Sequence, residues 1–120
     1  MEVELKEKKP KDIFAIFIFE IIGTLFLVCA IEMVVQKGGN TVAIAFALFL
    51  GIQVSGAITG GHFNPAVTLA VLIAGSHYKK IGYAFLLIVA QIIGAFAGAI
   101  VANLVTGGYL TVGPASLITD

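Results

Sequence analysis

Three long apolar segments dominate the sequence and restrict the folds that it can adopt. They cover residues 13–35, 41–58 and 81–105. Each approaches or exceeds the ~20 residues that a helix needs to cross the hydrocarbon core of a bilayer. The chain has 120 residues, of which 59% are hydrophobic and 12% charged, and a soluble domain of this size could not cover so much apolar surface. We therefore expect an all-α membrane protein with three transmembrane helices.

The first apolar segment follows a lysine-rich stretch, as the apolar core of a signal peptide does. It extends for 19 residues from Ile13 to Ile31 before any further extension to Val35, whereas the core of a signal peptide has roughly 7–15. Glu20 interrupts the segment, and no small-residue cleavage site follows it. We therefore interpret the segment as a retained membrane span.

A fourth apolar segment, Pro65–Ala74, is too short to span. Its ten residues give a helix about 15 Å long, half the thickness of the hydrocarbon core. The segment is therefore a re-entrant half-helix or an interfacial helix. Non-helical backbone at membrane depth is tolerated only where protein buries it or where it lines a wet cavity. The loop "TGGHF" before the segment is thus the first candidate for a pore wall.

The lysines predict the orientation of the spans. Six of the seven lie before the first or the third span, and one lies between the first two: Lys6, Lys8, Lys9, Lys11, Lys79 and Lys80 against Lys37. If the short helix enters and leaves on the same face, the six lysines share one side of the membrane. The positive-inside rule then places the N-terminus in the cytoplasm, or in the matrix of an organelle, and the C-terminus outside.

Asn64 and Pro65 together are typical of a helix start. Proline at the first helical position has its φ preset, and asparagine is a favoured N-cap. The side-chain oxygen of Asn64 is expected to accept from the backbone N–H of Ala66 or Val67, which leaves its NH₂ group as a fixed donor. The positive end of the helix dipole lies at the same point. The alternative is that Asn-Pro caps a surface helix in a soluble loop.

The residues before Asn64 supply acceptors. Two glycines allow tight backbone geometry, so that carbonyl groups can form a ladder along a channel wall. The expected ladder consists of Gly60, Gly61, His62 and Phe63. Acceptors beside a donor suit a small neutral solute that forms hydrogen bonds, and a positive dipole end can exclude protons and cations.

The stretch "SGAITGGHFNPAVTLA" resembles the first signature loop of the major intrinsic protein family, the aquaporins and glycerol facilitators. "EIIGTLFL" around Glu20 is similar to a family pattern in the first span, and "AQIIGAFAGA" around Gln91 is similar to one in the third. The resemblance covers about residues 12–105. It implies a channel for passive transport of water or small neutral solutes such as glycerol, with no cofactor.

Several residues are expected to support the loop rather than to contact solute. An acid within a span needs a partner, and Glu20 can accept from the loop's N–H groups, as the resemblance also implies. Gln91 is either a polar contact between helices or a brace for the loop, and Gly94 and Gly98 allow close helix packing. His62 is expected to contribute its carbonyl and its packing. No second ligand stands at metal-binding spacing from it, so no metal site is expected.

The resemblance also locates one position of the family's selectivity filter. Counting back 20 residues from Asn64 reaches Ile44, where water-selective members often carry an aromatic residue or His. An aliphatic residue leaves this wall apolar and less constricted, which argues against strict water selectivity. Phe46 could take the position only with an offset in the helix.

Family members resemble an inverted repeat of two halves, and this sequence corresponds to the first. It divides into a charged tail of residues 1–12, a half-channel domain of residues 13–105 and a C-terminal loop or tail of residues 106–120. The loop alone would face lipid with unpaired polar groups, so a second aquaporin-like half or another membrane subunit is expected as partner.

The nature of that partner is open. The chain could be one part of a split channel, a fragment of a full channel, or a non-conducting accessory subunit of a larger membrane assembly. The uneven distribution of lysines disfavours an antiparallel homodimer. An enzyme is not expected, because no nucleophile–base pair appears, and Glu20 and Glu32 are about 18 Å apart along one helix.

Overall fold

The computed structural model describes residues 12–75 and 80–107. It contains four helices and, within these residues, no strand. In chain order they are α1 (Ile13–Lys37), α2 (Val42–Thr59), α3 (Pro65–Ala74) and α4 (Ile81–Thr106). The predicted all-α class is confirmed, as are three long apolar helices and one short one. Lys6, Lys8, Lys9, Lys11 and Lys79 lie outside the described residues, as do the C-terminal residues from 108 onward.

The helix ends follow from local capping. The side chain of Asp12 accepts from Phe14 N at 3.0 Å and from Ala15 N at 3.4 Å, which fixes the start of α1. α1 continues two residues beyond the predicted limit of 35, because its last turn tolerates polar residues and the helix ends only at Gly38, which has φ +65°. α2 follows after Asn40, whose side chain accepts from Val42 N at 2.9 Å.

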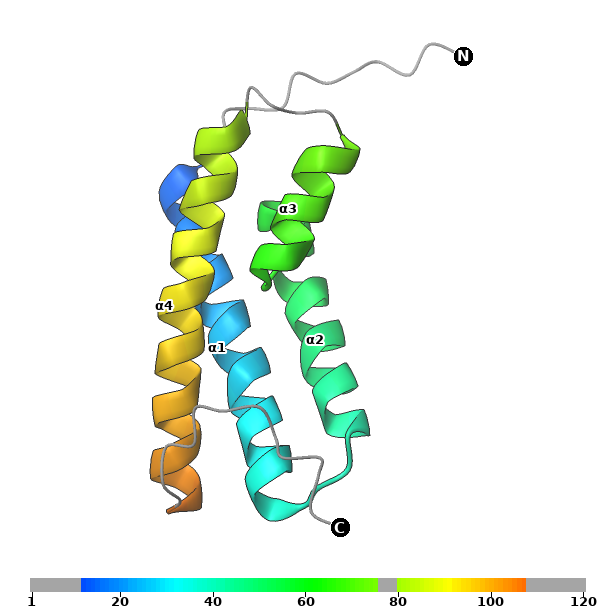
Figure 1. Cartoon of the computed structure of the whole chain (residues 1–120), viewed down its shortest axis with the longest axis vertical. Helices are drawn as coiled ribbons and strands as arrows, with labels where there is room; N and C mark the ends of the chain where they lie inside the picture. Colours follow the sequence, from blue (N-terminus) through cyan, green and yellow to red (C-terminus); the bar gives the residue numbers. More distant parts are fainter. Residues whose placement is uncertain (1–11, 76–79, 108–120) are drawn as a thin grey trace.

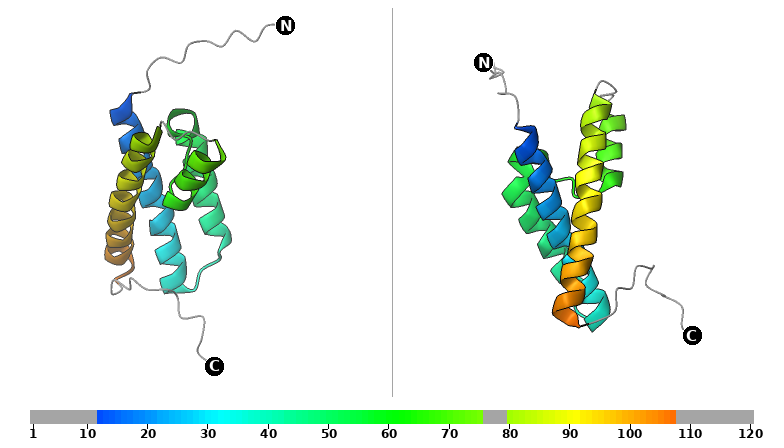
Figure 2. Two further views of the ribbon diagram at one scale, coloured as in Figure 1. Left: turned by 45° about the horizontal axis from the view of Figure 1, so that its top comes forward. Right: turned by 90° about the vertical axis from the view of Figure 1, so that its left-hand side faces the viewer.

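The loop before α3 turns into the bundle from the same end at which α3 leaves it. α1, α2 and α4 extend along the molecule, whereas α3 covers only part of its length (Figure 1). After α2 the loop turns back into the molecule, and α3 begins near mid-height and runs outward again, as the other views also show (Figure 2). α1 contacts α2 and α4, and α3 contacts α4. The short helix α3 is therefore re-entrant rather than interfacial.

Small residues bring α1 and α4 close together. Gly94 and Gly98 are buried on α4, and a Cβ atom on either would overlap a carbonyl oxygen of α1, that of Ile21 or that of Leu25. Ala90 lies fully buried on the same helix. Such close approach of two backbones requires residues without side chains at the crossing point.

Polar contacts join α1 and α4 at their C-terminal ends. Lys37 Nζ donates to the carbonyl oxygen of Thr106 at 3.1 Å. The hydroxyl group of Thr106 lies within hydrogen-bond distance of both Gln36 Oε1 and the carbonyl oxygen of Ala102, and its single hydrogen is available to one of them. A cation at the C-terminal carbonyls of a helix complements its dipole, so these contacts close the end of the bundle opposite to α3.

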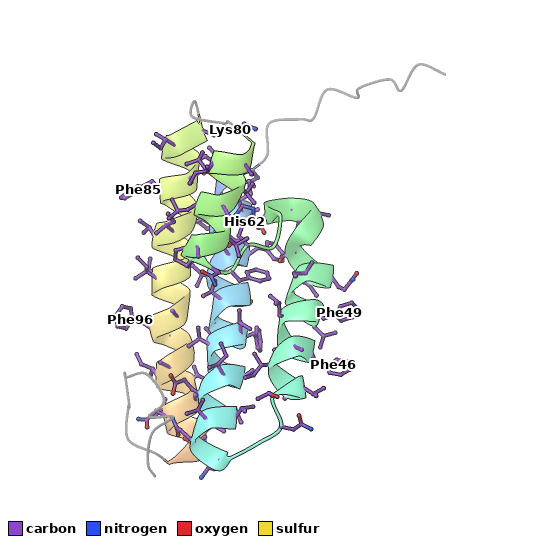
Figure 3. The ribbon with its side chains drawn as sticks, turned by 45° about the vertical axis from the view of Figure 1, so that its right-hand side comes forward. Phe46, Phe49, His62, Lys80, Phe85 and Phe96 are labelled. Carbon is purple, nitrogen blue, oxygen red and sulfur yellow. The ribbon has the colours of Figure 1, made fainter. Side chains whose placement is uncertain are left out.

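The outer surface is apolar. Phe46 and Phe49 on α2 and Phe85 and Phe96 on α4 point away from the bundle (Figure 3), and each is more than half exposed. Each of the three long helices is long and apolar enough to cross a membrane, by length and composition. Aromatic and aliphatic side chains on this surface are the kind that lipid tails cover.

Candidate functional site

A buried carboxylate binds the loop between α2 and α3. Glu20 on α1 has no exposed surface. Its Oε1 accepts from the backbone N–H of His62 at 3.1 Å, and its Oε2 accepts from that of Phe63 at 3.0 Å. Backbone N–H groups buried without an acceptor are costly, so these bonds hold the non-helical loop inside the bundle. They are contacts of the kind that the sequence led us to expect of Glu20.

A second set of hydrogen bonds joins α4 to Glu20 and to α3. Gln91 Nε2 donates to Glu20 Oε2 at 2.8 Å and to Thr68 Oγ1 at 2.9 Å. Thr68 Oγ1 in turn lies 3.1 Å from His62 Nδ1. Glu20, Thr68 and Gln91 are all buried. The bonds of Gln91 are contacts between helices, and its role as a brace for the loop stays a prediction.

The start of α3 has the geometry of a capped helix N-terminus. Asn64 has φ −153° and ψ 126°, and its Oδ1 accepts from Ala66 N at 2.9 Å. Pro65 occupies the first helical position. The Asn64 side chain is exposed, and with its oxygen engaged by the helix, its NH₂ group is the part that remains for other partners.

The two glycines of the loop adopt backbone conformations that other residues rarely adopt. Gly60 has φ +98° and Gly61 has φ +64°. Gly61 N donates to Thr59 Oγ1 at 2.8 Å. A side chain at either glycine would be strained, so the reversal after α2 depends on both.

Phe63 anchors the loop in a way that the sequence analysis missed. It has φ +49°, the only positive φ of a non-glycine residue among the described residues, and its side chain is 3% exposed. The ring lies against two glycines: a Cβ at Gly23 would overlap it, and a Cβ at Gly51 would be 2.9 Å from its Cε2. Gly23 and Gly51 are visible in the sequence, but only the packing of α1 and α2 brings them to the same ring.

Thr68 is the second residue that the sequence analysis missed. It lies one helical turn after Asn64. Its backbone N–H donates to the Asn64 carbonyl oxygen at 3.1 Å, and its hydroxyl group lies 3.3 Å from the same oxygen. The threonine within "NPAVT" was a visible signal, because a helix turn places it on the same side as the cap. Its contacts with His62 and Gln91 depend on packing that the sequence does not display.

A cavity of about 230 Å³ lies beside these residues, between α3, α4 and the end of α2. Its walls combine polar and apolar side chains: Thr59, His62, Thr68, Val71, Leu72, Lys80, Tyr83, Ala84 and Leu87. Among the described residues, no group of three His, Cys, Asp or Glu side chains could hold a metal ion. The cavity therefore offers hydrogen-bonding groups and one cationic side chain, that of Lys80.

Ile44 lies apart from the loop residues. It is half-buried in the first turn of α2, whose last turn leads to the loop. The 15 positions to Thr59 correspond to about 22 Å of helix. The role of Ile44 in a selectivity filter stays a prediction.

A bundle of several apolar spans that holds a buried re-entrant loop followed by a half-length helix belongs to the class of integral membrane proteins. The chain is a member of the major intrinsic protein family, whose profile matches residues 12–119. Together with the three apolar helices, this membership makes the chain a multi-pass membrane protein.

Curated relatives carry the names of water and glycerol channels. Aquaglyceroporin-2 of Rhizophagus irregularis is 43% identical over 108 residues, which cover 82% of this chain and 32% of that protein. Glycerol uptake facilitator protein-like 6 of Lactiplantibacillus plantarum is 45% identical over 86 residues, which cover 66% and 38%. Aquaporin TIP2-3 of Arabidopsis thaliana is 39% identical over 67 residues, which cover 56% and 26%.

The matches thus span between about a quarter and two fifths of the length of these relatives. No solved structure matches the chain in the same kind of comparison.

Proposed function

We propose that the loop before α3 and the first turn of α3 form one wall of a pore that passes water or small neutral solutes such as glycerol. A second aquaporin-like half supplies the opposite wall. The proposal rests on membership of the major intrinsic protein family and on relatives named as an aquaporin, an aquaglyceroporin and a glycerol facilitator.

The observation that carries the proposal is the direction of the loop's peptide groups. The N–H groups of His62 and Phe63 both point to Glu20, and that of Gly61 points to Thr59. In a trans peptide the C=O group points opposite to the N–H group of the next residue, and the described residues contain no cis peptide. The carbonyl groups of Gly60, Gly61 and His62 therefore point away from Glu20 and Thr59, as a ladder of acceptors along a pore requires.

Asn64 supplies a donor at the end of this ladder. Its Oδ1 is held by Ala66 N, so its NH₂ group is oriented away from the helix. The dipole of α3 adds partial positive charge at the same point. A solute with both donor and acceptor atoms, such as water or a polyol, can bind to this arrangement, whereas a cation is repelled.

A second half is proposed because the start of α3 is incompletely covered. Asn64, Ala66 and Val67 are exposed although α3 begins near mid-height of the bundle (Figure 1). Exposed loop backbone is not tolerated against lipid tails. A half of the same kind, with its own half-helix meeting α3 end to end, covers these groups and follows the inverted-repeat principle of transporters.

Osmotic shrinkage of proteoliposomes, followed by stopped-flow light scattering, tests the proposal. The protein is reconstituted with its native partners, and Asn64→Ala is compared with Asn40→Ala. Asn40 is a matched control because its side chain also accepts a helix N–H, that of Val42, outside the loop. Both variants lose one side-chain hydrogen bond to a backbone N–H at a helix start, worth about 1 kcal/mol. Only Asn64→Ala removes the pore donor, so its flux of water or glycerol should fall by about tenfold.

The outcomes separate the proposed channel from an accessory subunit. Flux that falls in Asn64→Ala and persists in Asn40→Ala supports a conducting pore through the loop. Equal flux in both variants contradicts the role of Asn64 as a pore donor. No flux above that of protein-free liposomes with every partner present contradicts the channel and favours a non-conducting role.

A further inference from the structure

The hydroxyl group of Thr68 has one hydrogen and three polar neighbours. It lies 2.9 Å from Gln91 Nε2, 3.1 Å from His62 Nδ1 and 3.3 Å from the carbonyl oxygen of Asn64. A hydroxyl group donates one hydrogen bond and accepts two. The hydroxyl group can therefore donate in only one of the three contacts, and in the others it can only accept.

The contact with Gln91 has a fixed direction because of Glu20. The Gln91 amide group lies between Glu20 Oε2 and Thr68 Oγ1. A carboxylate only accepts hydrogen bonds, so the side of the amide that faces Glu20 must be the NH₂ group. The same NH₂ group faces Thr68, and the hydroxyl oxygen of Thr68 therefore accepts from Gln91.

Two arrangements of the remaining hydrogen are possible. If Thr68 donates to His62, the hydroxyl group takes part in two hydrogen bonds. If Thr68 donates to the Asn64 carbonyl, His62 Nδ1 carries a proton and donates to Thr68, and the hydroxyl group takes part in three. The second arrangement uses the full capacity of a group that is 2% exposed, and buried polar groups favour complete hydrogen bonding. The 3.1 Å separation is also within the usual range for N–H···O bonds.

We propose that Thr68, oriented by Gln91 and Glu20, holds neutral His62 in the tautomer with its proton on Nδ1, so that Nε2 is a hydrogen-bond acceptor for solute at the cavity. Thr68 is then a positioning residue, and His62 takes a role beyond its backbone carbonyl. The solute-binding part of this inference rests on the proposed function of the loop, whereas the position of the proton does not.

The surroundings of the His62 ring suit an acceptor at Nε2. His62 lines the cavity of about 230 Å³ between α3 and α4, and its position under α3 is visible in Figure 3. Its Nε2 lies next to Gly60: a Cβ at that glycine would be 3.1 Å away. An acceptor at Nε2 adds to the carbonyl acceptors of the loop. The other tautomer would present a donor at the same place and interrupt the series.

Nitrogen NMR of the imidazole ring tests the proposal directly. The full chain is labelled with [¹⁵N]histidine and reconstituted in lipid at alkaline pH, where imidazole is neutral. The sequence has two histidines, so His77→Asn leaves the ring of His62 as the only signal. Couplings to the ring protons distinguish the nitrogens, because Nε2 couples to two of them and Nδ1 mainly to one. We expect a protonated Nδ1 and an unprotonated Nε2; a protonated Nε2 overturns the proposal.

Two variants separate positioning by Thr68 from its effect on folding. Thr68→Val keeps the shape and removes the acceptor for Nδ1–H, so the proton should move toward Nε2. Thr68→Ser keeps the hydroxyl group and should retain the original spectrum. A Thr68→Val spectrum equal to that of the unsubstituted chain contradicts the proposal. If Thr68→Val does not fold, the unsubstituted chain and Thr68→Ser still decide the position of the proton.

The NMR spectrum tests the positioning role of Thr68 and the flux assay tests the proposed channel, so either proposal can be contradicted without the other. A protonated Nδ1 in a protein without flux supports the positioning role and contradicts the proposed channel. Flux through a protein whose ring carries its proton on Nε2 supports the channel and contradicts the positioning role.

Discussion

The ring of Phe63 occupies the space that a side chain at Gly23 would need, so the re-entrant loop is fixed to α1 at a position that only glycine can hold. Glu20 lies one helical turn earlier on α1 and binds the backbone of the same loop. Side chain and backbone of Phe63 are thus held by two neighbouring turns of one helix. Its positive φ, unfavourable for an aromatic residue, is maintained by these contacts.

Gly23→Ala should therefore destabilise the loop. The added methyl group overlaps the Phe63 ring, and overpacking of this kind costs about 1–3 kcal/mol. We expect a lower free energy of unfolding in denaturant titrations in detergent, together with reduced solute flux. Gly82→Ala is the control, since no atom lies within 4 Å of a Cβ there; alanine in the first turn of α4 should be neutral or stabilise by up to about 1 kcal/mol. Equal stability of the two variants would show that the ring moves without cost.

Replacement of Glu20 by Gln should release the loop. Three N–H groups donate to this carboxylate, and an amide keeps only one acceptor oxygen and places an NH₂ group against a donor. Loss of hydrogen bonds to a buried charged acceptor costs about 1.5–3 kcal/mol each. We expect loss of flux and earlier unfolding. Glu32→Gln, on the same helix and partly exposed, should leave both properties nearly unchanged; an equal loss in this variant would point to a general effect of charge.

The crossing of α1 and α4 gives a third prediction. Gly94→Ala places a methyl group against the carbonyl oxygen of Ile21, so the helices must separate, at a cost of about 1–3 kcal/mol. The free energy of unfolding measures this cost. Gly39→Ala provides the comparison, because a Cβ there is 3.6 Å from its nearest neighbour, an ordinary contact. A Gly94→Ala protein as stable as Gly39→Ala would contradict the close approach of the two backbones.

The helices could be predicted from the sequence because apolar length and capping residues are local properties. The bounds Pro65–Ala74 agree with α3, since Asn64 and Pro65 mark the start of the helix and Gly75 follows its end. The end of α1 was predicted two residues early. Gln36 and Lys37 look like loop residues in sequence, but they make contacts with Thr106 across the bundle, which no local pattern displays.

The candidate site could be predicted only where a residue had an obvious physical need. Glu20 was recognisable because an acid inside an apolar span requires donors, and the loop has N–H groups that require acceptors. Thr68 and the Phe63 ring were not, since their importance depends on which face of α3 meets α4 and on the gap left by Gly23 and Gly51. Both follow from the packing of helices rather than from spacing in the chain.

Ile44 leads to a prediction about solute selectivity. If its side chain forms part of the narrow filter, Ile44→Phe should narrow the pore and lower the ratio of glycerol flux to water flux. A loss of about 1–3 kcal/mol per misfitted group corresponds to roughly a 5–200-fold change in this ratio. Phe46→Ile tests the neighbouring aromatic residue, which points away from the bundle (Figure 3) and should not affect the ratio. A shift in Phe46→Ile but not in Ile44→Phe would mean that the helix register is offset.

The orientation of the chain can be measured with single cysteines. Cys29 is the only cysteine of the sequence, so Cys29→Ser provides a background without thiols. In it, Gly39→Cys lies between α1 and α2, and Lys80→Cys lies at the start of α4, at opposite ends of the bundle. With the lysine-rich N-terminus inside, an impermeant maleimide added to intact cells should label Gly39→Cys alone.

The control for this labelling is permeabilisation, after which both cysteines should react. Labelling of Lys80→Cys alone in intact cells would reverse the proposed orientation. Labelling of both positions in intact cells would mean that the chain inserts in two directions. Two copies could then form the inverted pair by themselves, in spite of a lysine distribution that predicts a single orientation. The second half of the pore would then be a second copy of this chain.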